Sequence, residues 1–209
     1  NGGTNWSGLN NFSNLAPGTY NVRIRDAANT GCINVLNPAL VISEPTALSA
    51  VATSTNVTCF GGADGTITIT IPTGGYGTYE YSINGGGSWQ ASGTFTALVP
   101  GNYNVRMRDA ANITCIVVLD NALQITQPAM LNAVVTPTMV TCNGANDGII
   151  TITAPTGGYG TYEYSINGGT TWQASGTFNG LAPNTYDVRL RDAVNPTCVI
   201  TLNPALVIT

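Results

Sequence analysis

The sequence predicts an all-β protein made of tandem β-sandwich repeats of the immunoglobulin or fibronectin type III kind. The first observation is a repeat with a period of 83 residues, which brings Trp6, Trp89 and Trp172 into register. The segment PTGGYGTYEYSINGG occurs at 72–86 and again, unchanged, at 155–169. The second observation is strand-like alternation between closely spaced turn signals. Self-similarity at a fixed period of this kind identifies a repeat architecture.

The repeat register divides the 209 residues into about two and a half units. We expect residues 1–45 to be the C-terminal part of a first repeat, 46–128 a complete second repeat and 129–209 a third. Because the chain starts at a position that aligns with the middle of a unit, we expect it to be an excerpt of a longer protein. The units meet at Ser-Glu-Pro and Thr-Gln-Pro linkers, which are too short for free swivelling and predict a semi-rigid rod.

Apolar and polar residues alternate with a period of two in three segments of the second repeat, at 66–71, 79–83 and 103–108. This pattern is typical of half-buried strands. Further strands are expected at 48–59 and 115–125, with short ones near Trp89 and Phe95. Gly-rich and Pro-Gly turns separate these segments, and none has a helical period. Seven short strands in one unit indicate an immunoglobulin-like sandwich.

The composition argues against several classes of partner. Only 8% of the residues are charged and the net charge is −4, so the chain has no basic surface for nucleic acid. No stretch approaches the roughly 20 apolar residues of a membrane helix, so we expect no membrane insertion in this segment. There is no Lys or His, and all the basic residues are arginines in one recurring place: Arg23, Arg25, Arg106, Arg108, Arg189 and Arg191.

Cysteines occupy two fixed positions in each repeat. One position follows the first strand and holds Cys59 and Cys142, and the other precedes the last strand and holds Cys32, Cys115 and Cys198. Paired positions in a small domain without histidine predict disulfides and an oxidising compartment, since the CxxC or Cys/His spacing of a zinc site is missing.

The sequence allows two disulfide pairings. One cysteine of each type per unit favours bonds within a repeat, Cys59 to Cys115 and Cys142 to Cys198, and this is the pairing we prefer. In a seven-strand sandwich, however, these positions lie at opposite ends of the domain, beyond the limit of about 7 Å between Cα atoms. The alternative pairs Cys59 with Cys198 of the next repeat, which would lock each junction covalently.

Charged side chains repeat on two strands that are neighbours in a fibronectin-like topology. Arg106 and Arg108 point to the same face of their strand. On the neighbouring strand, Glu80 points to that same face of the sheet. We predict cross-strand pairing of Glu80 with Arg106 or Arg108, worth about 0.2–1 kcal/mol. The third repeat should pair Glu163 with Arg189 or Arg191. An arginine ladder that binds acidic glycans or a neighbouring chain is the functional alternative.

The repeating aspartates have a structural and a functional interpretation. Asp64 and Asp147 lie in Gly-rich loops that could wrap calcium, but calcium prefers six to eight oxygens and each loop offers one carboxylate. We therefore expect turns held by the aspartate side chain, and no bound cofactor. Turn capping is also expected where an aspartate follows the arginine pair: Asp26, Asp109 and Asp192.

Aromatic side chains offer a second candidate surface. Trp89 and Trp172 flank Asn-Gly-Gly turns, and Tyr76 and Tyr159 lie in Gly-rich loops, where exposed rings could stack on sugars. The alternating tyrosines of the strands are expected in the core. No nucleophile lies near a credible base, and the acids recur in every unit as structural residues do, so we expect no enzyme.

The motifs VTCFGGADGTITIT, GGYGTYEYSINGG and LAPGTYNVRIRDA with a following cysteine resemble the SprB-type repeat of bacterial gliding adhesins, and the resemblance spans every unit. It implies a cell-surface protein of Bacteroidota, exported by the type IX system, with an immunoglobulin-like fold. We expect a structural or adhesive rod or filament that serves attachment or gliding and associates with other copies of itself, end to end or laterally. The alternative is a carbohydrate-binding array on a secreted enzyme, with surface glycans as partners.

Overall fold

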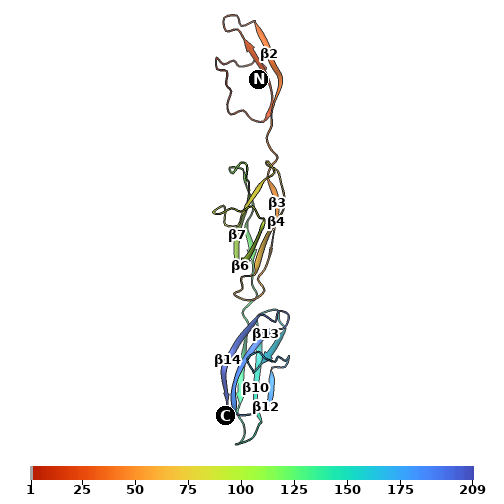
Figure 1. The fold of residues 1–209 in the computed structure, drawn as a ribbon, viewed down its shortest axis with the longest axis vertical. Coiled ribbons are helices and arrows are strands. Elements are labelled where there is room, and N and C mark those ends of the chain that lie inside the picture. The colour runs from red at the N-terminus through yellow and green to blue at the C-terminus, as the bar shows by residue number, and fades with distance from the viewer. Residues whose placement is uncertain (1) are drawn as a thin grey trace.

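A computed structural model describes residues 2–209, which form three units strung end to end, with the two chain termini at opposite ends (Figure 1). The first unit contains two strands and each of the others contains six. Strands β1 and β2 belong to the first unit, β3 to β8 to the second and β9 to β14 to the third. Their bounds are β1 Gly18–Arg25, β2 Ile33–Ile42, β3 Ser49–Thr55, β4 Gly65–Thr73, β5 Tyr79–Ser82, β6 Thr94–Leu98, β7 Gly101–Asp109, β8 Ile116–Ile125, β9 Asn132–Thr138, β10 Gly148–Thr156, β11 Tyr162–Ser165, β12 Thr177–Leu181, β13 Asn184–Asp192 and β14 Val199–Ile208.

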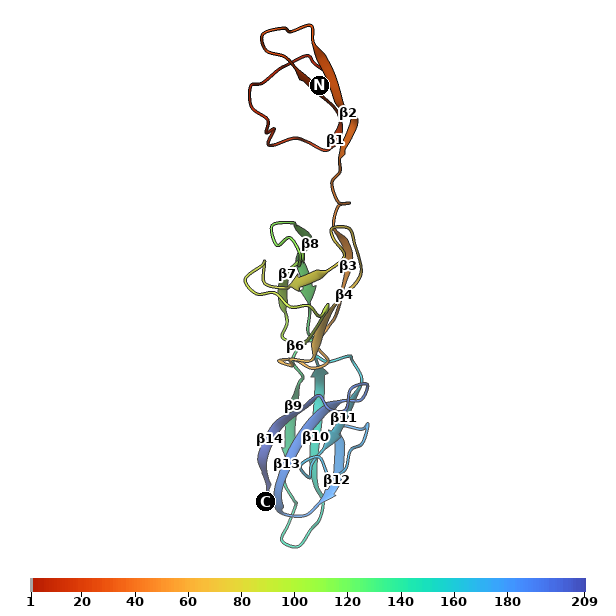
Figure 2. The same ribbon diagram turned by 45° about the horizontal axis from the view of Figure 1, so that its top comes forward.

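Each six-stranded unit is a sandwich of two three-stranded antiparallel sheets. The second unit pairs β3, β4 and β6 in one sheet and β5, β7 and β8 in the other, and the third unit repeats this order with β9 to β14. Figure 2 shows the strands running along the long axis. This arrangement of strands confirms the predicted tandem immunoglobulin-like fold.

The strand count differs from the prediction by one, because the segment at Trp89 is not a strand. Only an isolated bridge between Tyr81 and Gln90 forms there. The preceding turn is held by the side chain of Asn84, whose amide oxygen accepts the Ser88 N–H at 3.0 Å, so these backbone groups do not join a ladder.

The two sheets meet through the apolar side chains that alternate along the strands. In the second unit Ile67, Met107 and Ile125 are 0–1% exposed. The same positions of the third unit hold Ile150, Leu190 and Ile208, with the same exposure. The period-two pattern of the sequence therefore separates core from surface as predicted, except at Ile71. Ile71 is 73% exposed because the backbone takes φ +52° there and the register of β4 against β3 shifts.

The first unit has a single two-stranded sheet, and its apolar face is uncovered. Ile24 on β1 occupies the repeat position of Met107, yet it is 55% exposed. Burial at this position therefore depends on the facing sheet, since the β1–β2 sequence is similar to that of β7–β8 and both positions are apolar.

The difference in burial between Met107 and Ile24 predicts that truncation to alanine lowers the stability of the two units by different amounts. Met107→Ala should destabilise the second repeat by about 2–5 kcal/mol because it empties a fully buried site. Ile24→Ala, at the equivalent position of the first unit, should change stability by no more than about 0.5 kcal/mol. Hydrogen exchange resolved by repeat measures both effects, and equal losses for the two variants would contradict the core assignment.

Candidate functional site

The junction between the second and third repeats brings together residues far apart in the sequence. A disulfide joins Cys59, just after β3, to Cys198, just before β14, with 5.3 Å between the Cα atoms. The bond closes a loop with a sequence separation of 139 residues. In the chain-entropy model a loop of this length is worth about 5 kcal/mol. The two repeats are thus joined by a peptide and by a disulfide.

The preferred pairing within each repeat, Cys59 to Cys115 and Cys142 to Cys198, is wrong in this structure. Strands β3 and β8 lie side by side and run in the same direction along the rod, so the end of β3 and the start of β8 are at opposite ends of the domain (Figure 2). They are separated by roughly the length of β8, about 33 Å for its 10 residues. Among the described residues the free cysteines are Cys32, Cys115 and Cys142.

Asp64 holds the loop that presents Cys59. One carboxylate oxygen accepts the Thr58 N–H at 2.9 Å, and the other accepts the Thr58 hydroxyl. The Thr58 hydroxyl, followed by the Thr58 amide, lowers the pKa of Asp64 from its ordinary value of 3.8. In the third repeat Asp147 binds Thr141 in the same way, at 3.0 and 2.6 Å.

These hydrogen bonds show the role of Asp64 and Asp147, the two aspartates considered as calcium ligands, in this structure. Both oxygens of each carboxylate face the loop's own threonine, as expected for a turn held by an aspartate. Within residues 2–209 no group of three or more His, Cys, Asp or Glu side chains is placed to hold a metal ion. Asp64 and Asp147 therefore position the neighbouring cysteine loops.

Asp192 performs the corresponding task on the third repeat. Its side chain is fully buried, and one oxygen accepts the N–H groups of Val194 and Asn195 at 2.8 and 3.0 Å. The other oxygen accepts the Tyr159 N–H, and the Asp192 N–H donates to the Cys198 carbonyl at 3.1 Å. One carboxylate thus fixes both the loop before Cys198 and the loop that carries Tyr159.

Asp109 repeats this arrangement in the second unit, where it accepts the N–H groups of Tyr76, Ala111 and Asn112. The hydrogen bond from the Tyr76 amide is the largest cause that lowers the pKa of Asp109. Asp26 accepts the Ala28 and Asn29 amides, which likewise lower its pKa. The predicted turn capping is thus present at all three aspartates.

Tyr159 and the linker complete the junction. The Tyr159 hydroxyl donates to the carbonyl of Thr58 in the preceding repeat at 3.3 Å. On the linker, Gln127 Oε1 accepts the Gly61 N–H at 2.8 Å, and directly after the linker the Ala129 carbonyl accepts the Gly158 N–H at 2.9 Å. The linker is therefore anchored to both repeats, and the short Pro linker does not act as a free hinge.

A glycine permits the close passage of the linker over the third repeat. Gly157 has φ +81°, and a Cβ atom at this position would lie 2.1 Å from the Met130 carbonyl oxygen. Any other residue would clash with the backbone that follows the linker, so the first glycine of the PTGGYG pair is needed where the chain enters the third repeat.

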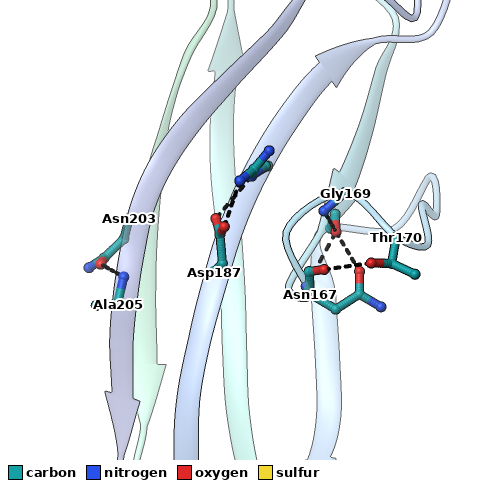
Figure 3. Close-up of polar contacts among 8 residues, drawn as sticks. Asn167, Gly169, Thr170, Asp187, Asn203 and Ala205 are labelled. Carbon is teal, nitrogen blue, oxygen red and sulfur yellow. Dashed lines mark hydrogen bonds and ion pairs between the residues drawn. The ribbon is translucent and has the colours of Figure 1, made fainter.

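The predicted ion pairs form with one arginine of each pair. Arg108 binds Glu80 at 2.7 Å, and Arg191 binds Glu163 at 2.6 Å. The other two arginines instead bond along their own strand. Arg106 donates to Asn104, while Arg189 donates to both oxygens of Asp187 at 3.0 and 2.7 Å (Figure 3).

The paired arginines also cover the tryptophans. The Arg108 guanidinium carbon lies 4.5 Å from the ring centre of Trp89, and Arg191 stands at the same distance from Trp172. Arg25 and Trp6 repeat the contact in the first unit. One face of each indole is thus occupied by a cation. In the second and third repeats the arginine also binds a glutamate, which gives a Glu–Arg–Trp stack that was not predicted from the sequence.

Of the four aromatic residues considered for glycan or partner contact, Tyr76 and Tyr159 are the more exposed, at 64% and 50%. Trp89 and Trp172 are half-buried beneath the arginines. Because Tyr159 contacts the preceding repeat, its role in this structure is at the junction. The repeat register gives Tyr76 the same position in the second repeat.

The fold and the junction define a class of protein, the tandem-repeat rods built from immunoglobulin-like domains. The chain carries SprB repeats, since the family model for the SprB repeat matches residues 51–88 and 134–171. SprB repeats belong to cell-surface proteins, consistent with an extracellular location. Over the described residues, no helix has the length and apolar character needed to cross a membrane.

Two solved structures are distantly similar. A C-terminal 282-residue fragment of intimin, in complex with the intimin-binding domain of the translocated intimin receptor, has 17% identity and a TM-score of 0.36. The three N-terminal domains of the Highly Immunogenic Outer Capsid protein (Hoc) of bacteriophage RB49 have 16% identity and a TM-score of 0.40. Each match covers 78% of this chain, and 64% and 59% of the other chains respectively. No curated protein matched the sequence.

The carboxylate that holds the Cys59 loop predicts a measurable titration. Because the pKa of folded Asp64 lies below its ordinary value of 3.8, its stabilisation of the loop is complete above that value. It is lost as the pH falls through the lowered pKa of the folded state. The Thr58 amide signal, followed by NMR, should therefore titrate with a midpoint below 3.8, and Asp64→Asn should abolish this titration. The Thr141 amide beside Asp147 serves as an internal control, and a midpoint at or above 3.8 would contradict the assignment.

Proposed function

We propose that this chain is a tension-bearing segment of a stiff extracellular rod or filament that serves attachment or gliding motility, without catalysis. The single observation that carries the proposal is the disulfide between consecutive repeats, Cys59 to Cys198. The SprB repeats and the anchored linker support the same function.

The position of the disulfide determines which strands would carry tension. A force applied along the rod enters the second repeat through β3 and reaches Cys59. The bond then transfers it to Cys198, from which β14 leads out of the third repeat. The intervening residues 60–197, including all the strands from β4 to β13, lie outside this covalent path. A pulled rod would therefore keep its length even if those strands unfolded.

The low charge of the chain suits association with other copies. The chain has 8% charged residues, so copies packed laterally or end to end desolvate few charges.

Export by the type IX system and a role in gliding are part of the same proposal, supported by the SprB repeats. Surface glycans are the alternative partners, and the cation over each tryptophan face limits stacking of sugars on that face.

Stretching single molecules of the chain by its two ends tests the proposal. In the oxidised protein, unfolding should release about 470 Å less chain than in the reduced protein. This is the length of the bypassed chain, which spans a sequence separation of 139 residues, at about 3.4 Å per residue. Cys59→Ser should show the longer extension even without reductant.

Cys115→Ser is the matched control, because Cys115 is free in this structure and its loss should leave the short extension unchanged. Equal extensions before and after reduction would show that the bond does not bypass the domains, and the tension-bearing function would then be abandoned.

A further inference from the structure

We propose that Cys142 and Cys115 are half-sites for further inter-repeat disulfides of the same kind, each bonding to the cysteine of the opposite position on another SprB-type repeat. This inference deepens the proposed function, since it extends the covalent junction from one pair of repeats to a continuous array. The partner is defined by its chemistry: Cys142 takes a repeat that presents a cysteine before its last strand, and Cys115 takes one that presents a cysteine after its first strand.

The observed bond supplies the reference for both half-sites. Cys59 and Cys142 occupy the same repeat position, and so do Cys198 and Cys115. At the junction between the second and third repeats, Cys59 and Cys198 face each other and are bonded, with their Cα atoms 5.3 Å apart. In the third repeat Cys142 is exposed and free.

The half-site at Cys142 has the bonded geometry before any partner is present. Asp147 accepts the Thr141 N–H at 3.0 Å, where Asp64 accepts Thr58 at 2.9 Å. The Ala145 N–H donates to the Cys142 carbonyl at 3.0 Å, as the Gly62 N–H donates to the Cys59 carbonyl at 2.9 Å. Because the Cys142 loop is already ordered, binding of a partner repeat costs little conformational entropy in this loop, which favours formation of the disulfide.

The half-site at Cys115 matches that of Cys198 equally well. The Asp109 N–H donates to the Cys115 carbonyl at 3.0 Å, compared with 3.1 Å from Asp192 to Cys198. The hydroxyl of Tyr76 occupies the repeat position from which Tyr159 reaches across the junction. Tyr76 is 64% exposed, against 50% for Tyr159, so its ring is available to a docking repeat.

The two half-sites are complementary, and neither complements itself. The face with Cys142 offers the Thr141 carbonyl as an acceptor, whereas the face with Cys115 offers the Tyr76 hydroxyl as a donor, by analogy with Thr58 and Tyr159. Contacts between unlike faces are heterologous and generate an open linear array rather than a closed dimer. Each added repeat again presents a free cysteine at its far end.

Bond formation is an oxidation whose balance is simple. The two thiols lose two protons and two electrons as the sulfur–sulfur bond forms. The electron acceptor is the disulfide of an oxidised dithiol oxidoreductase or of oxidised glutathione, which is reduced to two thiols. The attacking thiolate comes from exposed Cys142.

In such an array every junction would be crossed by one peptide and one disulfide. Within each repeat the first strand ends at one bonded cysteine and the last strand begins at the other, as β9 does at Cys142 and β14 at Cys198. A covalent path would then enter one repeat along its first strand, cross the disulfide, and leave the next repeat along its last strand. Two such paths, offset by one repeat, would run along the rod. The strands between them would carry no covalent load.

Disulfide mapping of the native protein, alkylated under non-reducing conditions, tests this inference. The peptide with Cys142 should be found joined to a peptide whose cysteine follows the Arg-Asp-Ala motif, and Cys115 to one whose cysteine follows Val-Thr. A partner peptide from within these 209 residues identifies a second copy, and one with a different sequence identifies a repeat outside them. Both results support the proposal.

Alkylated, unpaired Cys142 in the native protein would overturn the inference, and so would its bonding to a cysteine of the same position. Cys142→Ser should abolish the mapped crosslink without altering the Cys59–Cys198 peptide, which serves as the matched control in the same digest. The stretching experiment depends only on the Cys59–Cys198 bond, so failure of the array and failure of the tension-bearing function give different results.

Discussion

The first and last strands of each complete repeat run side by side in the same direction, and the rest of the architecture depends on this constraint. The chain enters a domain at one end and leaves it at the other, which makes the array a rod (Figure 1). The same constraint puts the cysteine after the first strand and the cysteine before the last strand at opposite ends of one domain. They can meet only across a junction, as Cys59 and Cys198 do.

The junction combines interactions of different durability. Hydrogen bonds from Gly61 to Gln127 and from Tyr159 to Thr58 set the orientation of the repeats. Each contributes on the order of 1 kcal/mol and breaks readily under load. The disulfide adds a covalent link that does not depend on the folded state of either sandwich. Noncovalent contacts therefore determine the geometry of the rod, whereas the covalent bond determines its strength.

Polar side chains that make several hydrogen bonds or ion pairs have a common structural role in this molecule. Asp64 holds one half of the junction and Asp192 the other, each by accepting several N–H or O–H groups of its own repeat. The Glu80–Arg108–Trp89 stack stiffens the outer face of a strand pair. Recurrence along the array had suggested structural roles for the acidic residues, and their contacts agree with that interpretation.

The sequence by itself determined the repeat period, the position of the core strands and the fold class, because alternation and turn residues act over a few positions of the chain. It also narrowed the partners of Glu80 to two arginines, from side-chain direction and from the strand neighbours that a fibronectin-like topology implies. Only the tertiary structure decided which arginine is used, that Trp89 lies beneath it, and that Cys59 pairs with Cys198. These contacts join residues from separate strands or domains, and their geometry depends on how whole strands are placed relative to one another. Ile24 and Met107 illustrate the same dependence, since equivalent apolar residues in strands of similar sequence are exposed or buried according to the presence of a facing sheet.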